Sequence, residues 1–167
     1  PVGGEESPTG WPLWISGPTA APRSALLFVL SDGFIRYFVA KDPGHDASIA
    51  ARIDAVNRYL FGELGFTGNR EQYDDPRNSC LNDVLERRLG IPITLSLLYM
   101  EVGRRIGLPL RGVSFPGHFL VKCAVDEGSI VLDPYAAGIS LGMGDLQKRL
   151  REVRGGEVSR AIVSSLL

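Results

Sequence analysis

One histidine and one aspartate lie where a β-hairpin would bring them together. His118 begins a predicted strand and Asp133 ends the next one, with the turn-forming residues Asp126-Glu127-Gly128 between the two. Facing residues of an antiparallel pair lie within hydrogen-bond reach, so the spacing predicts a His118–Asp133 pair. Such a pair either orients an imidazole for proton transfer beside a nucleophile or simply holds the hairpin in register.

The chemistry of this pair depends on a nucleophile, and the start of a helix is where the helix dipole favours an anion. A helix is predicted to begin at Ile91-Pro92, because proline suits a first turn. Its early residues include Thr94 and Ser96 rather than a thiol. A hydroxyl needs an aligned base far more than a thiol does, so Thr94 is interpreted as a capping residue and Ser96 as a packing residue.

The two cysteines of the chain are Cys80 and Cys123. Cys123 follows His118 by five residues on the same predicted strand, so alternation directs it to the opposite face, a core position. Cys80 lies in the first turn of a predicted helix and is interpreted as a small buried residue, with an activated thiol as the alternative. His45 is expected in an exposed loop, and these residues lack the spacing of a zinc site.

Apolar periodicity places helices before the sheet. The predicted helices span roughly 47–64, 79–89, 91–106 and 145–153, the third being the most apolar and hence central. The predicted strands span 110–114, 118–125 and 129–132, and a loop is expected at 138–144. Helices followed by a sheet indicate the α+β class.

The ends of these helices carry recognisable signals. Asp46 is predicted to cap the first helix, Asn78 or Ser79 to cap the second, and Gly90 to end the second. Leu97 widens the apolar stripe of the central helix, so most of that helix is expected to be buried.

Several motifs occur in order along the chain: FGELGF at 61–66, DPRNS at 75–79, GIPITLS at 90–96, FPGHFL at 115–120 and DPY at 133–135. With these motifs the chain resembles the SirB-type branch of the transglutaminase-like superfamily. The resemblance spans roughly residues 55–150 and does not extend to 1–45.

The resemblance implies a papain-like transglutaminase core, in which a central buried helix packs on an antiparallel sheet. Active relatives use a cysteine at the start of that helix, a histidine on the next strands and an aspartate on the strand after. His118 and Asp133 match the histidine and the aspartate, whereas Ile93 and Thr94 occupy the cysteine position. The resemblance therefore implies the remnant of a Cys-His-Asp triad.

Three segments are expected along the chain. Residues 1–45 are interpreted as irregular, 46–154 as the transglutaminase-like domain, and 155–167 as the start of a C-terminal extension. In many members of the resembled family a tetratricopeptide-like tail follows, and residues 158–167 resemble the lead-in to it.

Composition excludes several classes of function. Lys and Arg number 18 against 19 Asp and Glu, and this net charge of −1 gives no electrostatic basis for binding nucleic acid. The apolar run at 25–30 is far too short to span a bilayer. We expect a cytoplasmic protein without a cofactor.

Three functions are consistent with these residues. The preferred hypothesis is a non-catalytic domain that binds a protein or peptide in a groove lined by the His118–Asp133 pair together with Thr94, Ser96 and Tyr135. The first alternative is a cysteine-dependent amidase, peptidase or acyltransferase in which Cys80 acts with that pair. The second is a structural module in which the pair serves stability alone.

Overall fold

The computed structural model describes residues 47–167 of the chain. The irregular segment predicted at 1–45, the loop position of His45 and the cap at Asp46 lie outside the described residues.

The described part is a mixed α+β structure. Its helices are α2 (Ile49–Asn57), α3 (Leu81–Arg87), α4 (Pro92–Arg105), α5 (Met143–Arg154) and α6 (Arg160–Leu166). Its strands are β1 (Thr67–Gly68), β2 (Leu89–Gly90), β3 (Leu110–Phe115), β4 (His118–Val125), β5 (Gly128–Asp133) and β6 (Ile139–Leu141). A π-helical turn (Arg58–Glu63) continues α2, and 3₁₀ turns occupy Pro76–Ser79 and Pro134–Ala136.

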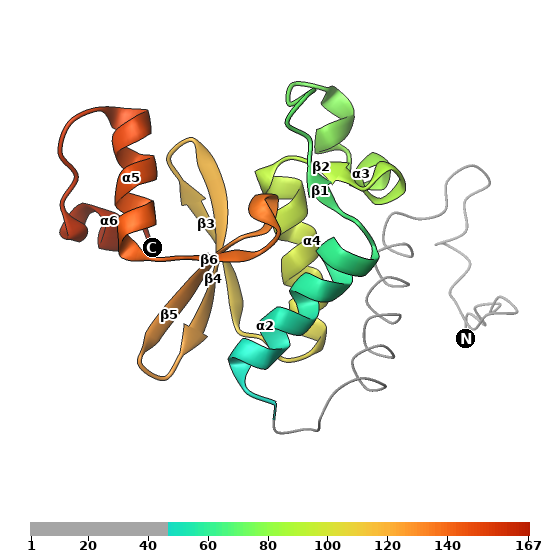
Figure 1. The fold of residues 1–167 in the computed structure, drawn as a ribbon, viewed down its shortest axis with the longest axis horizontal. Helices are drawn as coiled ribbons and strands as arrows, with labels where there is room; N and C mark the ends of the chain where they lie inside the picture. Colours follow the sequence, from blue (N-terminus) through green and yellow to red (C-terminus); the bar gives the residue numbers. More distant parts are fainter. Residues whose placement is uncertain (1–46) are drawn as a thin grey trace, which may run out of the picture.

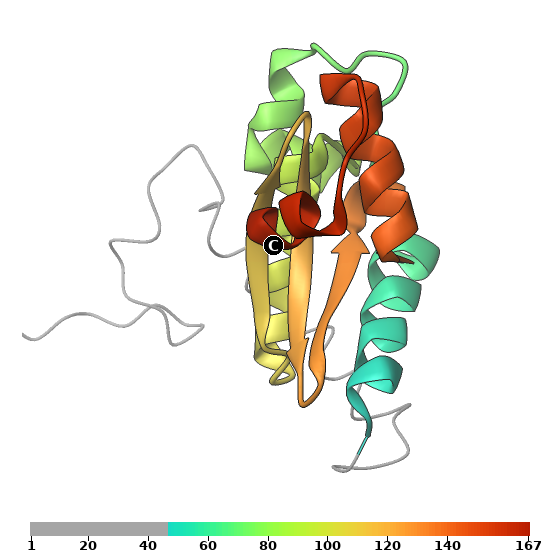
Figure 2. The ribbon, with the colours of Figure 1, turned by 90° about the vertical axis from the view of Figure 1, so that its left-hand side faces the viewer.

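A four-stranded antiparallel sheet lies between two helical layers. Its strand order is β3-β4-β5-β6, each strand pairing with its neighbour in sequence. Helices α2 and α4 lie on one side of the sheet, and α5 and α6 lie on the other (Figures 1 and 2). A short parallel pair, β1 with β2, packs close to α4.

Each face of the sheet contributes to a separate apolar core, because successive side chains of a strand point in opposite directions. In β4, Val121 and Cys123 belong to the core that α2 and α4 complete, whereas Leu120 belongs to the core under α5 and α6. Helix α6 joins this second core through the fully buried Val163, so part of the predicted 155–167 extension packs on the sheet.

Most predicted elements are confirmed, but some helix ends differ. Ser48 caps α2, accepting a hydrogen bond from Ala51 N at 3.3 Å. The cap predicted at Asn78 or Ser79 is wrong, because a 3₁₀ turn capped by Asp75 intervenes and Cys80 takes the N-cap position of α3. The stop predicted at Gly90 is also wrong: Arg88 ends α3 in the left-handed conformation (φ 59°).

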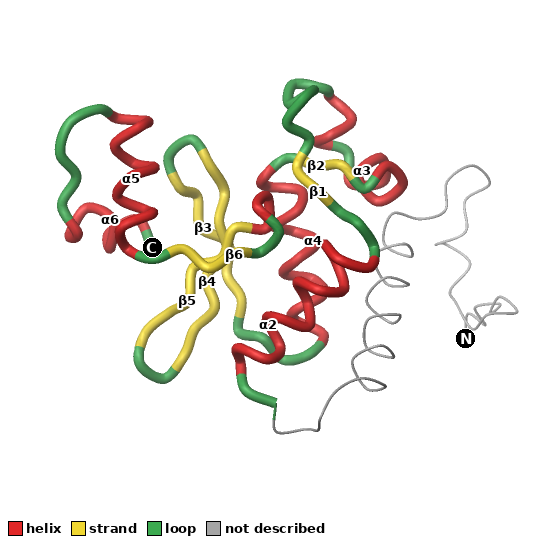
Figure 3. Tube along the Cα trace, viewed as in Figure 1, coloured by secondary structure: helices red, strands yellow, loops and turns green. Residues whose placement is uncertain are grey.

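Three short strands, β1, β2 and β6, were not predicted from the sequence. β1 and β2 have two residues each, too few to show an alternating pattern. β6 lies within the segment expected to be a loop; it is the last strand in the order of the sheet, paired with β5, and Figure 3 marks it as a short strand.

The central helix α4 is confirmed as an element but not as almost wholly buried. Leu98 and Tyr99 are at most 1% exposed, whereas Ile93 and Leu97 are 44% and 47% exposed. Residues four apart lie on one face of a helix, so one side of α4 is uncovered by the described residues. No helix among residues 47–167 is both long enough and apolar enough to cross a membrane.

The neighbouring leucines of α4 provide a matched test of this packing. Leu98→Ala removes a buried side chain and should lower the free energy of unfolding by about 2–5 kcal/mol. Leu97→Ala should change it by less than about 1 kcal/mol, because Leu97 is half exposed. Urea denaturation of both variants measures the difference, and equal losses would show that α4 is packed on a different face.

Candidate functional site

The predicted histidine–aspartate pair forms. His118 Nε2 lies 2.9 Å from Asp133 Oδ1, and the two side chains are 15% and 1% exposed. Because Val121 pairs with Leu132, His118 and Asp133 are diagonal neighbours rather than directly opposed residues, still on one face of the sheet. The start of β4 and the end of β5 thus place a partly exposed imidazole beside a buried carboxylate.

Asp133 has two further partners that the sequence analysis did not anticipate. Tyr135 N donates to Asp133 Oδ1 at 3.1 Å, closing the 3₁₀ turn that follows β5. Arg149 Nη2, from α5, lies 2.7 Å from Asp133 Oδ2. Burial raises the pKa of Asp133, but the hydrogen bond and charge of His118, together with Arg149, outweigh it, so the pKa is lowered overall.

Tyr135 covers the pair on one side. Its ring meets that of His118 edge to face, with centroids 5.8 Å apart, and meets Tyr73 edge to face at 6.3 Å. The guanidinium carbon of Arg70 lies 6.0 Å from the Tyr135 ring centroid. Gly68 makes this arrangement possible, because a Cβ atom there would overlap the Tyr135 ring.

Hydrogen bonds connect Tyr135 to the start of α4 through the loop that follows β1. Tyr135 Oη donates to Asn69 O at 3.2 Å, and Asn69 Nδ2 donates to Asn78 Oδ1 at 3.1 Å. Thr94 Oγ1 donates to Asn78 O at 2.9 Å and accepts from Ile91 N at 3.1 Å. The loop therefore braces the turn that carries Tyr135 against the first turn of the central helix.

The pair lies on the sheet face that α5 covers. His118 and Leu120 have the same parity in β4, as do Asp133 and Val131 in β5, and both apolar residues belong to the second core. The ion pair with Arg149 of α5 agrees with this orientation.

The remaining predicted site residues occupy different environments. Thr94 is 4% exposed, and its hydroxyl accepts a hydrogen bond from Ile91 N. This agrees with its interpretation as a capping residue. Ser96 is fully buried, and its hydroxyl makes no hydrogen bond to a described residue. Tyr135 is partly exposed beside His118.

The two cysteines differ in their exposure to solvent. Cys123 is fully buried in the first core, as predicted, and burial raises the pKa of its thiol. Cys80 is exposed, so its interpretation as a buried core residue is wrong. The physical reason is the 3₁₀ turn before it, which leaves Cys80 at the junction of two helical segments. No hydrogen bond joins Cys80 to His118 within residues 47–167.

Sequence reasoning missed Arg149, Asn69 and Asn78. Arg149 lies in a strongly polar helix between the buried Leu146 and Leu150, and one arginine among several there carries no signal of its contact. Asn69 and Asn78 stand in turn-forming stretches, where asparagine is ordinary. Among the described residues, no three His, Cys, Asp or Glu side chains are grouped to hold a metal ion.

Comparison with known proteins decides the family. Residues 35–163 match the transglutaminase-like superfamily, a range that includes every residue of the site. The chain belongs to this superfamily. The mixed α+β architecture is consistent with a transglutaminase-like core. No solved structure matches the chain significantly.

Similar proteins include UPF0162 proteins of bacteria and F-box only protein 21 of mammals. A UPF0162 protein of Xylella fastidiosa is 56% identical over 107 residues, covering 64% of this chain and 38% of that protein. A UPF0162 protein of Pseudomonas aeruginosa is 35% identical over 146 residues, 86% of this chain and 52% of that protein. F-box only protein 21 of Mus musculus is 42% identical over 97 residues, 53% of this chain and 16% of that protein. The chain thus spans about half or less of these relatives' lengths.

Acid should weaken the structure through Asp133. Its pKa is lowered below the ordinary 3.8, so ionised Asp133 adds stability above that pH, and this contribution is lost as pH falls through the folded-state pKa. Between about pH 4 and pH 2 the free energy of unfolding should fall more steeply for the wild type than for Asp133→Asn. The exposed Asp126→Asn is the control and should keep the wild-type slope; equal slopes for all three proteins would contradict the prediction.

The hydrogen bonds that join Asn69, Asn78 and Thr94 predict that Asn78 is essential to local stability. Asn78→Ala removes an amide that donates to Gln72 O and Tyr73 O and accepts from Asn69, in a fully buried position. The loss should be about 1–3 kcal/mol in the free energy of unfolding, measured by urea denaturation. Ser79→Ala, at the exposed neighbouring position, should change it by no more than about 0.5 kcal/mol. Similar losses of stability in the two variants would show that the hydrogen bonds of Asn78 do not stabilise this part of the fold.

Proposed function

We propose that this chain is a non-catalytic member of the transglutaminase-like superfamily that binds a protein or peptide segment. We place it in the SirB-type branch, as a cytoplasmic regulatory or scaffold domain that a tetratricopeptide-like tail follows in the longer protein. The order of the motifs along the chain supports the branch, and the match of residues 35–163 to the transglutaminase-like superfamily supports the wider family.

One observation carries the proposal: the histidine–aspartate pair is intact while the helix start that would supply a nucleophile is occupied by other residues. The first turn of α4 holds Ile93 and Thr94. Thr94 Oγ1 is committed to Asn78 O at 2.9 Å, so its proton is not directed to an imidazole. A nucleophilic hydroxyl would need that base within reach.

The additional hydrogen bond and ion pair of Asp133 support the same conclusion. In a catalytic triad the carboxylate is there to orient and stabilise the imidazole. Here Asp133 is also bound to Arg149 Nη2 at 2.7 Å and to Tyr135 N at 3.1 Å, so it holds α5, β4 and the turn after β5 together. The pair is thereby a rigid part of a surface, which suits recognition.

The surface that we assign to binding is formed by His118, Tyr135, Tyr73 and Arg70. Tyr73 is 48% exposed, and the Tyr135 ring that it meets and the His118 ring beyond that are each partly exposed. Aromatic side chains with few rotatable bonds and an arginine are the residues that dominate binding energy at protein interfaces.

The alternative function is a cysteine-dependent amidase, peptidase or acyltransferase that uses Cys80. Its exposure favours this alternative, because a nucleophilic thiol must be accessible. The alternative requires Cys80 to reach His118 when substrate is bound.

The binding proposal predicts how two variants behave in a phage-display selection. Peptides enriched on the immobilised wild type should bind His118→Ala at least about tenfold more weakly, because His118 lies in the proposed surface. Cys80→Ser should bind them as the wild type does. Fluorescence anisotropy with each enriched peptide measures these affinities, and circular dichroism checks that both variants fold.

Two outcomes would contradict the proposal. One is a selection in which every enriched peptide binds the wild type and His118→Ala equally. The other is release of ammonia from glutamine-containing peptides by the wild type that is lost in both His118→Ala and Cys80→Ser, since this would establish the enzyme.

A further inference from the structure

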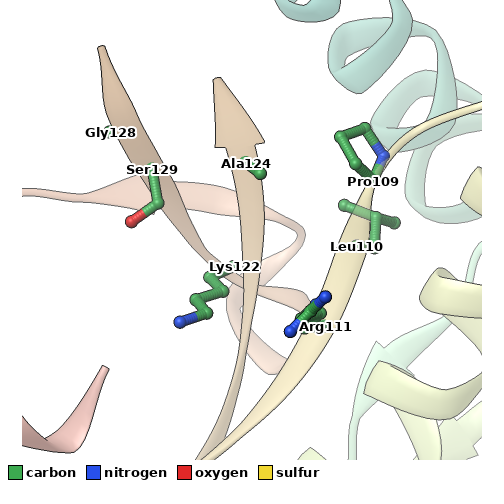
Figure 4. A pocket seen from close by; sticks show the side chains of 7 residues that line it. All are labelled: Pro109, Leu110, Arg111, Lys122, Ala124, Gly128 and Ser129. Carbon is green, nitrogen blue, oxygen red and sulfur yellow. The ribbon is translucent and has the colours of Figure 1, made fainter. Parts of the chain in front are cut away.

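A cavity of about 490 Å³ is lined by residues at the start of β3, the end of β4 and the start of β5 (Figure 4). Strand alternation places Arg111, Lys122 and Ser129 on the same face as Val113, Leu120 and Val131, because the two members of each pair are two residues apart on one strand. The three apolar residues belong to the core under α5 and α6. Beyond that core the same face is lined by cationic and small polar side chains.

Two cations face each other in this cavity. Arg111 and Lys122 are direct partners across β3 and β4, and Figure 4 shows their side chains on adjacent strands. Like charges in directly opposed positions repel and destabilise a sheet. Neither makes an ion pair with an acidic side chain of residues 47–167, and no acidic side chain lines the cavity. Lys122 Nζ donates to a carbonyl oxygen, that of Leu167.

We propose that this cavity docks an acidic peptide segment of a partner protein, with a Glu or Asp carboxylate seated between Arg111 and Lys122. A guanidinium binds a carboxylate through two parallel hydrogen bonds, and the ammonium adds a second charge. The carboxylate relieves the repulsion between the two cations. This site is separate from the surface around His118, which stands at the opposite end of β4.

The lining favours a peptide over a free polyanion. Pro109 and Ala124 add apolar atoms to the lining beside the cations, which suits the aliphatic stem and backbone of a peptide. Nucleic acids bind through many phosphate contacts, whereas this cavity offers two cations. Asp126 and Glu127 stand in the turn just before the lining residue Gly128, where they disfavour an extended polyanion.

Binding of a defined probe tests the proposal on the whole chain. The probe is a fluorescein-labelled nonapeptide of alternating glutamate and alanine, and its control is the matching glutamine–alanine peptide. Anisotropy should show binding of the glutamate peptide that weakens as salt is added, and at least about tenfold weaker binding of the glutamine peptide. Lys148→Gln, which removes an exposed cation of α5, should leave the affinity unchanged.

A charge reversal separates loss of binding from loss of folding. Arg111→Glu places a carboxylate opposite Lys122, so the melting temperature should rise or stay constant while binding of the glutamate peptide falls at least about tenfold. Retained binding in Arg111→Glu, or a clear fall of its melting temperature, would overturn the proposal. So would equally tight binding of a single-stranded DNA oligonucleotide or displacement of the peptide by inorganic phosphate, which would assign the cavity to polyanions.

Discussion

The buried carboxylate of Asp133 is the interaction on which the arrangement of the site depends. It is 1% exposed, and it binds His118 from β4, the backbone of Tyr135 after β5, and Arg149 from α5. An ionised carboxylate is costly to bury, so these partners must all be present in the folded state. One side chain therefore fixes a strand, a turn and a helix relative to one another.

A second constraint links that cluster to the central helix. The loop after β1 carries Asn69 and Asn78, whose amides are bonded to each other at 3.1 Å and whose backbone oxygens accept from Tyr135 and Thr94. The hydroxyl nearest to the start of α4 is thus used for structure. Together, the two constraints fix the position of the histidine of a transglutaminase-like fold and use the Thr94 hydroxyl for structure, which supports the proposed binding role.

Apolar periodicity and turn residues predicted the main helices and strands, whereas the short 3₁₀ turns and the contacts between elements were not predicted. Helix α4 and the hairpin of β4 and β5 follow from apolar periodicity and turn residues, and the His118–Asp133 pair follows from their spacing. The exposure of Cys80 and the contact of Arg149 depend on a 3₁₀ turn and on how α5 lies across the sheet. Such tertiary details leave no periodic trace, so sequence reasoning could not supply them.

The alkylation rate of each cysteine, measured in the folded wild type and in His118→Ala, tests the absence of an activated nucleophile most directly. The account predicts that Cys80 reacts at the rate of an ordinary exposed thiol, unchanged in His118→Ala, and that Cys123 reacts only after unfolding. Rapid modification of Cys80 that slows markedly in His118→Ala would contradict it, because the imidazole would then be activating a catalytic thiolate.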